Sequence, residues 1–251
     1  MYIFRAKLNG LMAIVPLCAM HGGAANTPNA SPNCFAIGIS VIGRFNNVNS
    51  VEIGSDSGGN TLTDITHVSA GFNFCGNHIS NVSRTTFGNQ IYDIQEMADL
   101  TECTIGNNVQ ISQMYHLRNV AVGNEIQNIE LVGIQESTFG NTLLNCKAYH
   151  SQRLHLTNNI KDVVIAYCNN VKIGNSVMAS RIDYSTSITI GSECKKNDFD
   201  YCTGIELGHR CSNNYFDNSH NITLMGDSGQ NTFRYCSNNI FEIIASLFKL
   251  F

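Results

Sequence analysis

Glycine recurs along the middle of this chain at every seventeenth position, an interval that we call one period. An apolar residue precedes each glycine and an asparagine follows most of them, as in Val122-Gly123-Asn124. A repeat this short is too small for a helical pair or a propeller blade, which need about 33 to 50 residues. It suits one coil of a parallel β-solenoid, in which coils stack about 4.8 Å apart. The glycines are Gly106, Gly123, Gly140, Gly174, Gly191 and Gly208, with Thr157 at the remaining position.

The same register continues on both sides of this stretch with small changes of step. Toward the N-terminus one step is a residue longer and another is a residue shorter, and the step that follows Gly208 is again a residue longer. The sequence therefore predicts an all-β fold, a single-stranded parallel β-helix (β-solenoid) of about twelve coils over residues 38–243. We expect right-handed winding, with left-handed winding as the alternative because the coil is close in length to three hexapeptides. The outer glycines are Gly38, Gly54, Gly71, Gly88 and Gly226.

Each coil contains short alternating patterns that end at the glycine. Ile188-Thr189-Ile190 places two apolar side chains on one side of the chain and a polar one on the other, which marks a strand with one buried face. Three short strands around a filled interior account for the coil. Glycine and asparagine at one corner are expected to accept left-handed backbone geometry at low cost.

A Cys-x-x-Asn-x-Phe motif repeats in the later coils. Asparagines one coil apart are expected to hydrogen-bond to one another, as stacked amides do in cross-β structures. The copies run from Cys194 to Phe199, from Cys211 to Phe216 and from Cys236 to Phe241, with a shortened relative from Gly229 to Phe233.

The ten cysteines would suggest disulfides in a secreted chain, but their spacing favours columns. Cys194 and Cys211 are one period apart, while Cys168, Cys202 and Cys236 are two periods apart with serine between them. Residues one period apart stack, so we expect inward columns of small side chains, a role that free cysteine fills well. Zinc is disfavoured because no Cys-x-x-Cys pair occurs, and occasional disulfides stay open as an alternative. The pattern suggests folding in a reducing cytoplasm, including that of a host cell.

Composition and motifs exclude several function classes. Only 14% of residues are charged and the net charge is −4, which argues against a nucleic-acid partner because such proteins concentrate Lys and Arg on one face. The apolar run near the N-terminus is too short to span a membrane. No phosphate-binding loop, dinucleotide fingerprint, zinc-protease motif or nucleophile elbow occurs, so we expect no cofactor and no metal.

The two ends of the chain differ from the repeats. Residues 1–37 are expected to be an N-terminal cap and linker or the remnant of an upstream domain. A signal peptide over residues 1–20 is the alternative, although no clean cleavage site follows the basic start and mixed apolar stretch. Residues 244–251 are strongly apolar, and we expect them to cap the last coil or to pack against sister chains.

The segment Ile190-Gly191-Ser-Glu-Cys194-Lys-Lys-Asn197, at this coil length, resembles the Asn/Gly/Cys-rich β-solenoids of tail-fibre and tailspike-like proteins in phages and prophages of gut bacteria. The resemblance covers about residues 38–243. It implies a virion tail or extracellular surface location and a homo-oligomer, most simply a trimer. Similar solenoids also occur as adhesins and as polysaccharide-degrading tailspikes, so no single functional residue follows from it.

One group of side chains is a candidate site. Asp183, Asp200 and Asp217 are one period apart, so their side chains are expected to stack about 5 Å apart on an outward face. Paired carboxylates about 5 to 9 Å apart serve glycoside hydrolysis, which makes these three the candidate catalytic residues. Calcium binding is a second interpretation, and a solvated acidic strip is the one we favour. The candidate glycan-binding residues beside them are Arg181, Asp198 and Tyr215.

A second column consists of Tyr167, Tyr184 and Tyr201, with Asn218 next. We interpret it as a stacked aromatic ladder that stabilises the fold, with a sugar-stacking platform as the alternative.

A solenoid without insertions between its coils presents flat faces rather than the concave pocket that enzymes usually need. The leading hypothesis is therefore a structural and adhesive segment of a phage tail fibre or similar surface appendage, with a host surface polysaccharide or receptor as its partner. The alternatives are a carbohydrate-active enzyme of the tailspike type, either a polysaccharide lyase or a glycoside hydrolase, and a secreted bacterial adhesin.

Overall fold

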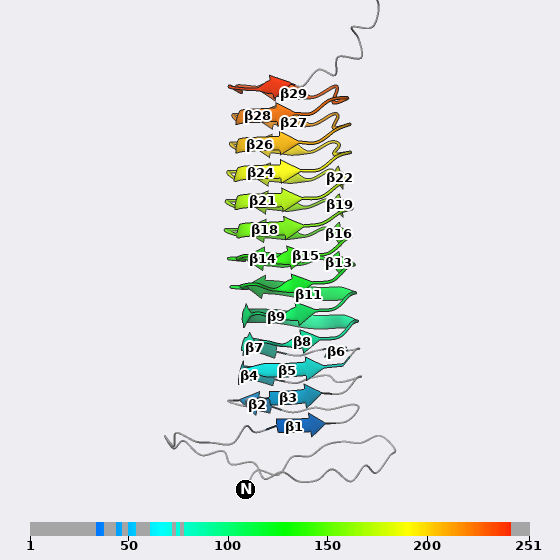
Figure 1. Ribbon diagram of the computed structural model, residues 1–251, viewed down its shortest axis with the longest axis vertical. Coiled ribbons are helices and arrows are strands. Elements are labelled where there is room, and N and C mark those ends of the chain that lie inside the picture. Colours follow the sequence, from blue (N-terminus) through cyan, green and yellow to red (C-terminus); the bar gives the residue numbers. More distant parts are fainter. Residues whose placement is uncertain are drawn as a thin grey trace, which may run out of the picture.

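The computed structural model describes residues 34–37, 44–46, 50–53, 61–71, 74–75 and 78–241, which form a rod of coils stacked along one axis (Figure 1). Strand pairs are parallel throughout this part of the chain. Each coil pairs with the coil before it and the coil after it, so an all-β parallel solenoid is confirmed. Within these residues, no helix has the length and apolar character needed to cross a membrane.

Three walls surround the interior of the rod. Wall I is a 13-stranded parallel sheet with one strand from each successive coil, which agrees with a coil count near twelve. Its strands are β1 (Cys34–Ile37), β3 (Ser50–Ile53), β5 (His67–Ala70), β8 (Thr86–Phe87), β10 (Thr104–Ile105), β12 (Ala121–Val122), β15 (Thr138–Phe139), β18 (Gln152–Leu156), β21 (Asn169–Ile173), β24 (Thr186–Ile190), β26 (Thr203–Leu207), β28 (His220–Leu224) and β30 (Ile240–Phe241).

Wall II carries the strand that precedes wall I in each coil, and wall III is the short wall after the glycine corner. The strands of wall II are β2 (Arg44–Asn46), β4 (Thr61–Ile65), β7 (His78–Ser83), β14 (Glu130–Val132), β17 (Lys147–Tyr149), β20 (Val164–Ala166), β23 (Arg181–Asp183), β25 (Asp198–Asp200), β27 (Tyr215–Asp217) and β29 (Thr232–Arg234). The strands of wall III are β6 (Phe74–Cys75), β13 (Ile126–Gln127), β16 (Leu143–Leu144), β19 (Ile160–Lys161) and β22 (Val177–Met178), while β9 (Ile91–Thr101) and β11 (Val109–Tyr115) run through both walls.

The coils keep a register of one period over most of the rod, and the predicted changes of step toward the N-terminus are confirmed. Ile190 pairs with Leu207, one period away. The step from Phe87 to Ile105 is one residue longer, and the step from Ile37 to Ile53 is one residue shorter.

The predicted extra residue before Gly226 is wrong. Leu207 pairs with Leu224, so Met225 occupies the position equivalent to Gly208, and its N–H donates to Leu207 O at 3.0 Å. The asparagines that crowd the earlier glycines have ended here, because His209 occupies the asparagine position in the coil below Met225. The register of one period therefore continues through the last described coils.

Columns of apolar side chains fill the interior. Ile188 and Ile190 are buried while Thr189 between them faces solvent, which confirms the predicted alternation. Phe199 and Phe216 stack with ring centroids 4.7 Å apart. Removal of such apolar surface from water contributes about 25 cal/mol per Å², and this is the main source of stability in a fold with few charges.

The corner glycines are required by close contact between coils. A Cβ on Gly123 would lie 2.5 Å from Asn107 Oδ1 and 2.7 Å from Gly106 O. The same Oδ1 accepts hydrogen bonds from the backbone and side-chain amides of Asn124 at 2.7 and 2.9 Å, so the asparagine ladder leaves no room for a side chain. Left-handed geometry occurs one residue later, at Glu125 with φ 60°. The expectation that the Gly-Asn pair adopts it is wrong.

Thr157 occupies the glycine position, as predicted, and loosens the asparagine ladder. Its hydroxyl donates to Asn141 Oδ1 at 3.0 Å. The N–H of Asn158 reaches the same oxygen at 3.2 Å, compared with 2.7 Å for the equivalent bond of Asn141 to the coil below. A small displacement therefore accommodates the extra side chain.

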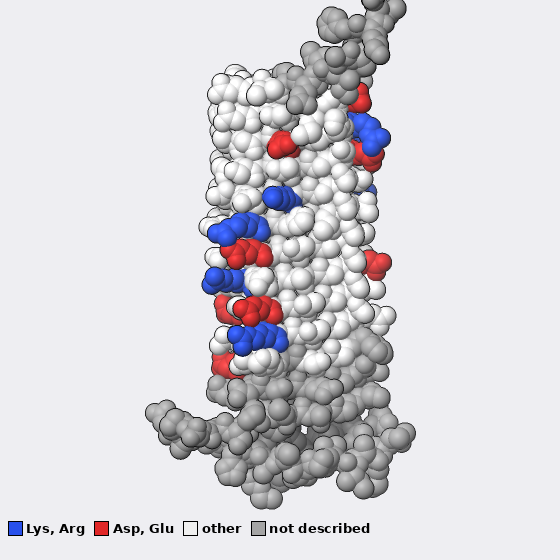
Figure 2. All heavy atoms as spheres, in the orientation of Figure 1, with Lys and Arg blue, Asp and Glu red and all other residues white. Residues whose placement is uncertain are grey.

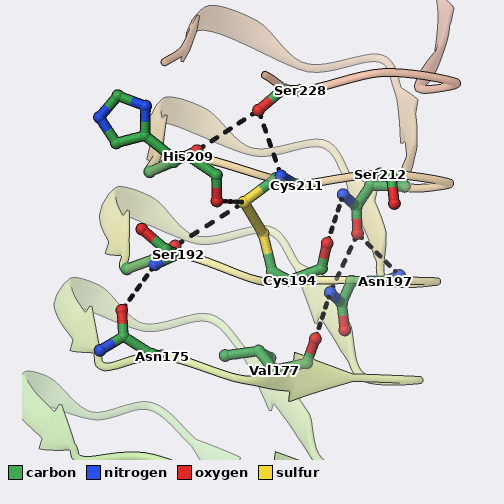
Figure 3. The surroundings of a disulfide bond; sticks show 12 residues. Asn175, Val177, Ser192, Cys194, Asn197, His209, Cys211, Ser212 and Ser228 are labelled. Atoms are coloured by element: carbon green, nitrogen blue, oxygen red, sulfur yellow. Dashed lines mark hydrogen bonds between the residues drawn. A yellow bond between two sulfur atoms is a disulfide. The ribbon is translucent and has the colours of Figure 1, made fainter. Parts of the chain in front are cut away.

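The cysteine columns face the interior, as predicted, but one pair is linked. Cys168 and Cys202 are buried free thiols with Ser185 between them, and the N–H of Cys168 donates to Ser185 Oγ at 3.1 Å. Cys194 and Cys211 stack with Cα atoms 4.6 Å apart and form a disulfide (Figure 3). The interpretation of this pair as free thiols is wrong, because one coil step brings two inward cysteines within bonding reach.

The Cys-x-x-Asn-x-Phe motif forms a buried amide ladder, as predicted. Asn197 Nδ2 donates to Asn214 Oδ1 at 3.0 Å, and Asn214 Nδ2 donates to Asn231 Oδ1 at 3.0 Å. The copy around Asn231 is full length rather than shortened, because Ser228 takes the cysteine position and its Oγ accepts a hydrogen bond from the N–H of Cys211.

The copy predicted from Cys236 is wrong. Phe241 pairs with Leu224, which places it in wall I rather than beside Phe216 in wall II. Cys236 accordingly continues the column of Cys202. A match at the Cys, Asn and Phe positions of the motif is therefore not enough to assign a residue to a wall, because walls I and II have similar apolar patterns.

The expectations for the two chain ends fall mostly outside the described residues. Residues 34–37 form β1 of wall I, while the rest of the 1–37 segment and the apolar segment 244–251 lie outside.

Candidate functional site

Wall II brings the six candidate residues together on three consecutive strands. Asp183 pairs with Asp200, and Asp200 pairs with Asp217, so the predicted register is confirmed. We refer to these three residues as the aspartate column. The neighbouring candidates Arg181, Asp198 and Tyr215 pair with one another in the same way.

The aspartate column is less exposed than predicted. Asp183 is only 8% exposed, and Arg181 on the same strand reaches over it, with Nε 2.9 Å from Oδ1 and 2.7 Å from Oδ2. The hydrogen bond to Asp183 raises the pKa of Arg181. The interpretation as a solvated strip is therefore wrong for Asp183, because an arginine two residues away covers the carboxylate.

Asp200 and Asp217 are partly buried, and each has one carboxylate oxygen buried without a hydrogen-bond partner. The next residue in the column is Arg234 on β29, which pairs with Asp217. Hydrogen bonds to Tyr235 and Tyr215, together with the charge of Asp217, raise the pKa of Arg234. A guanidinium therefore stands at each end of the aspartate column.

A ladder of exposed rings lies beside the aspartate column, at the next residue of each coil. Its members, His150, Tyr167, Tyr184 and Tyr201, stack with centroids 5.2, 5.1 and 4.9 Å apart and planes within 15°. We call these four the tyrosine ladder. The three tyrosines are 54%, 48% and 50% exposed. Partial desolvation between its neighbours raises the pKa of Tyr184.

The predicted stacking is thus confirmed, and it limits what the tyrosine ladder can bind. Each internal ring has both faces covered by its neighbours, so solvent reaches only ring edges and hydroxyl groups. A sugar ring can stack face-on only where the ladder ends.

The arrangement gives little support to a metal site. Among the described residues, no group of three or more His, Cys, Asp or Glu side chains is positioned to hold a metal ion. Calcium needs six to eight oxygens around one point, whereas the aspartate column places its carboxylates in a row, one coil step apart.

Two further surface features lie away from these residues. Figure 2 shows a stripe of alternating charge along one edge of the rod, and ion pairs Arg84–Glu102 and Arg153–Glu136 join successive coils through exposed side chains. Such exposed pairs contribute at most about 1 kcal/mol each. An open groove follows the asparagine ladder at the glycine corner, lined by Asn89, Gln90, Asn107, Asn108, Asn124 and Glu125.

Sequence reasoning missed Arg234 and Tyr235 as neighbours of the site. The predicted coil was one residue too long at Met225. In that prediction Arg234 therefore did not align with the aspartate column, and Tyr235 did not align with the tyrosine ladder. Phe216 and Phe233 are one period apart in the sequence, and this spacing was the signal that could have placed Arg234 and Tyr235 correctly. The two phenylalanine rings stack in the structure.

Comparisons with known proteins give a likeness of fold alone. No protein-family model and no curated protein matches the sequence. One similar solved structure, from Parabacteroides merdae and provisionally assigned as a glycosyl hydrolase, has 9% identity and a TM-score of 0.22, covering 61% of this chain and 78% of its own. Two structures of PfbA, a surface adhesin of Streptococcus pneumoniae, each have 12% identity. Their TM-scores are 0.23 and 0.21, with 76% and 82% of this chain and 64% and 90% of theirs covered.

Proposed function

We propose that this chain is a rigid structural and adhesive segment of an extracellular appendage of the phage tail-fibre type, and that wall II binds a surface glycan. The observation that carries the proposal is the unbroken register from Ile105 to Arg234, in which coils follow one another without insertions. The resulting surface consists of flat walls and long ladders. Such a surface suits contact with an extended polymer at several coils, and repeated weak contacts add up to strong attachment.

The side chains of wall II support carbohydrate as the partner. The exposed tyrosine ladder adjoins the carboxylates and guanidinium groups of the aspartate column. Sugars combine apolar C–H faces with hydroxyl-rich edges. They therefore fit a surface where aromatic rings and charged hydrogen-bonding groups lie side by side.

A polysaccharide lyase or glycoside hydrolase is the second candidate, and it depends on the aspartate column. Hydrolysis needs one carboxylic acid and one carboxylate that both reach the substrate. Asp183 is covered by Arg181, while Asp200 and Asp217 each have a buried oxygen. The proposal therefore assigns the column a structural and binding role.

The test is an array of bacterial surface polysaccharides probed with labelled protein, followed by assays for new reducing ends and unsaturated products. We expect binding without cleavage, weaker binding by Tyr201→Ala, which removes the ring at the end of the ladder, and unchanged binding by the wall I control Thr189→Ala. Absence of binding to every polysaccharide would contradict the adhesive function. If the parent cleaves a polysaccharide and the Asp200→Asn variant does not, the enzyme function is supported instead of the adhesive function.

A further inference from the structure

The tyrosine ladder is interrupted at Asn218. Asp200, Asp217 and Arg234 pair in register, so the residues that follow them, Tyr201, Asn218 and Tyr235, occupy the same corner of successive coils. All three of these corner residues have left-handed backbone geometry, with φ 50°, 48° and 51°. Asparagine is shorter than tyrosine, so the outer part of this rung is open. We call this space the open rung.

Tyrosines occupy the equivalent corner position in the coils on both sides of the open rung. Tyr201 stacks on Tyr184 below, but its upper face has no aromatic neighbour among the described residues. Tyr235 is 70% exposed and stands two coils above Tyr201. One step of the ladder is 4.9 to 5.1 Å, so two steps leave room for one ring. A ring midway between them would lie one ladder step, 4.9 to 5.1 Å between centroids, from each neighbour.

Polar groups line the base and side of the open rung. The side-chain amide of Asn218 has no hydrogen-bond partner in the described chain, and an amide can both donate and accept. The guanidinium carbon of Arg234 lies 4.9 Å from the centroid of the Tyr235 ring. The open rung therefore combines apolar walls with a hydrogen-bonding rim.

We propose that the open rung binds one pyranose ring of a surface glycan. The proposal rests on the adhesive function above and specifies where it acts. The C–H face of the sugar packs on the free face of Tyr201, and its hydroxyl groups meet the Asn218 amide and the Arg234 guanidinium. A flat aromatic ligand has no ring of hydroxyl groups to use these partners, so the chemistry favours a sugar.

The lower end of the tyrosine ladder offers no equivalent site. Gly133 leaves a rung without a side chain between His116 and His150, but the His116 ring leans into that space. Its Cδ2 would lie 3.1 Å from a Cβ on Gly133, and its Nδ1 is 3.2 Å from Asp99 Oδ1. The free ring face and the unpaired amide occur together at the open rung.

The test uses saturation-transfer NMR and titration with the methyl glycosides of glucose, galactose, mannose and N-acetylglucosamine. We expect at least one to bind the parent, with the strongest transfer to its ring C–H protons. Asn218→Tyr fills the open rung and continues the ladder, so it should keep or raise the melting temperature. It should also weaken binding about tenfold or more, equivalent to about 1.4 kcal/mol. The control Asn221→Tyr adds the same side chain at an exposed residue of that coil that is also left-handed, φ 55°, and should leave binding unchanged.

Asn218→Ala gives a second measurement should Asn218→Tyr fail to fold. It keeps both tyrosines and removes the amide, so the glycoside should bind several-fold more weakly. Absence of glycoside binding to the parent, or equal binding by parent and Asn218 variants, overturns the subsite. Binding to the polysaccharide array tests the adhesive function separately from the subsite. If the Asn218→Tyr variant binds the polysaccharide array as well as the parent does, the subsite proposal is contradicted and the adhesive function is still supported.

Discussion

Arg181 Nε lies 2.7 Å from Asp183 Oδ2, and the arginine is exposed while the carboxylate beneath it is buried. The two residues are two apart on β23, a spacing that places their side chains on the same side of the sheet. The carboxylate depends on its partner more than the guanidinium does, because only the carboxylate is removed from water.

We expect Arg181→Gln to lower the free energy of unfolding by about 1–3 kcal/mol, because it leaves the buried Asp183 carboxylate without its cation. The double variant Arg181→Gln/Asp183→Asn should recover most of the loss. Urea denaturation at neutral pH measures both. The control Arg153→Gln breaks an exposed pair with Glu136 and should cost less than about 1 kcal/mol. Equal losses for the two arginine variants would contradict the prediction.

Asp200→Asn is expected to leave the melting temperature unchanged or to raise it. Asp200 lies in register between Asp183 and Asp217, so the amide removes the middle of three stacked negative charges and supplies a donor. The difference from the parent should shrink at about 1 M salt, because salt screens repulsion between partly exposed charges. Thermal unfolding followed by circular dichroism at two salt concentrations checks this. A clear fall in melting temperature would show that repulsion is not the dominant effect.

The corner glycines give a prediction with an internal control. A Cβ on Gly123 would lie 2.5 Å from Asn107 Oδ1, so Gly123→Ala should destabilise the protein by about 1–3 kcal/mol through overpacking. A Cβ on Gly229 meets nothing within 4 Å, so Gly229→Ala should be neutral or stabilise by up to about 1 kcal/mol. Chemical denaturation of the two variants measures both changes in the free energy of unfolding. Similar values for both would mean that close contact is not what selects glycine.

Alkaline stability should depend on Cys202. Burial, with smaller contributions from Asp183 and Asp200, raises the pKa of its thiol from an ordinary 9.0 to about 12. Below pH 9.0 the thiol is protonated in the folded and unfolded chain alike, so it adds no pH dependence. Between the two values only the unfolded chain loses the proton, so stability falls as pH rises, by up to about 1.4 kcal/mol per pH unit.

Cys202→Ser tests this prediction without changing the character of the column, because Ser185 and Ser219 already occupy it in the adjacent coils. The variant should lose less stability than the parent between about pH 8 and pH 10.5, since serine does not ionise there. Urea denaturation across this range is the measurement. Parallel pH curves for the two proteins would show that Cys202 does not contribute.

The walls and the interior could be predicted because a solenoid converts spatial neighbours into a constant sequence interval. Ile190 and Leu207 are buried one above the other for the same reason that they are one period apart in the chain. The same logic placed the aspartate column in register. It could not show that Arg181 covers Asp183, because that depends on a side-chain conformation rather than on a position in the coil.

The left-handed corners could be predicted from residue type only in part, because many of them are Asn or Asp but many others are not. Glu193, Lys196 and Tyr201 all adopt positive φ, at 67°, 56° and 50°, although their side chains share no local preference for it. The geometry is imposed by hydrogen bonds to the next coil, as when the N–H of Tyr201 donates to Asp217 O at 3.1 Å. Local propensity is overruled wherever stacked neighbours fix the backbone.

The constant spacing between coils has a consequence for how such a gene changes. Internal coils contact only the coils on either side, and each interface repeats the same parallel register. A duplication or deletion of seventeen codons, beginning at any point within this stretch, therefore keeps the remaining interior columns in register. We expect it to add or remove one whole coil and to alter the reach of the rod by about 4.8 Å. The length of the rod can therefore change by one coil at a time while the register of the interior is kept.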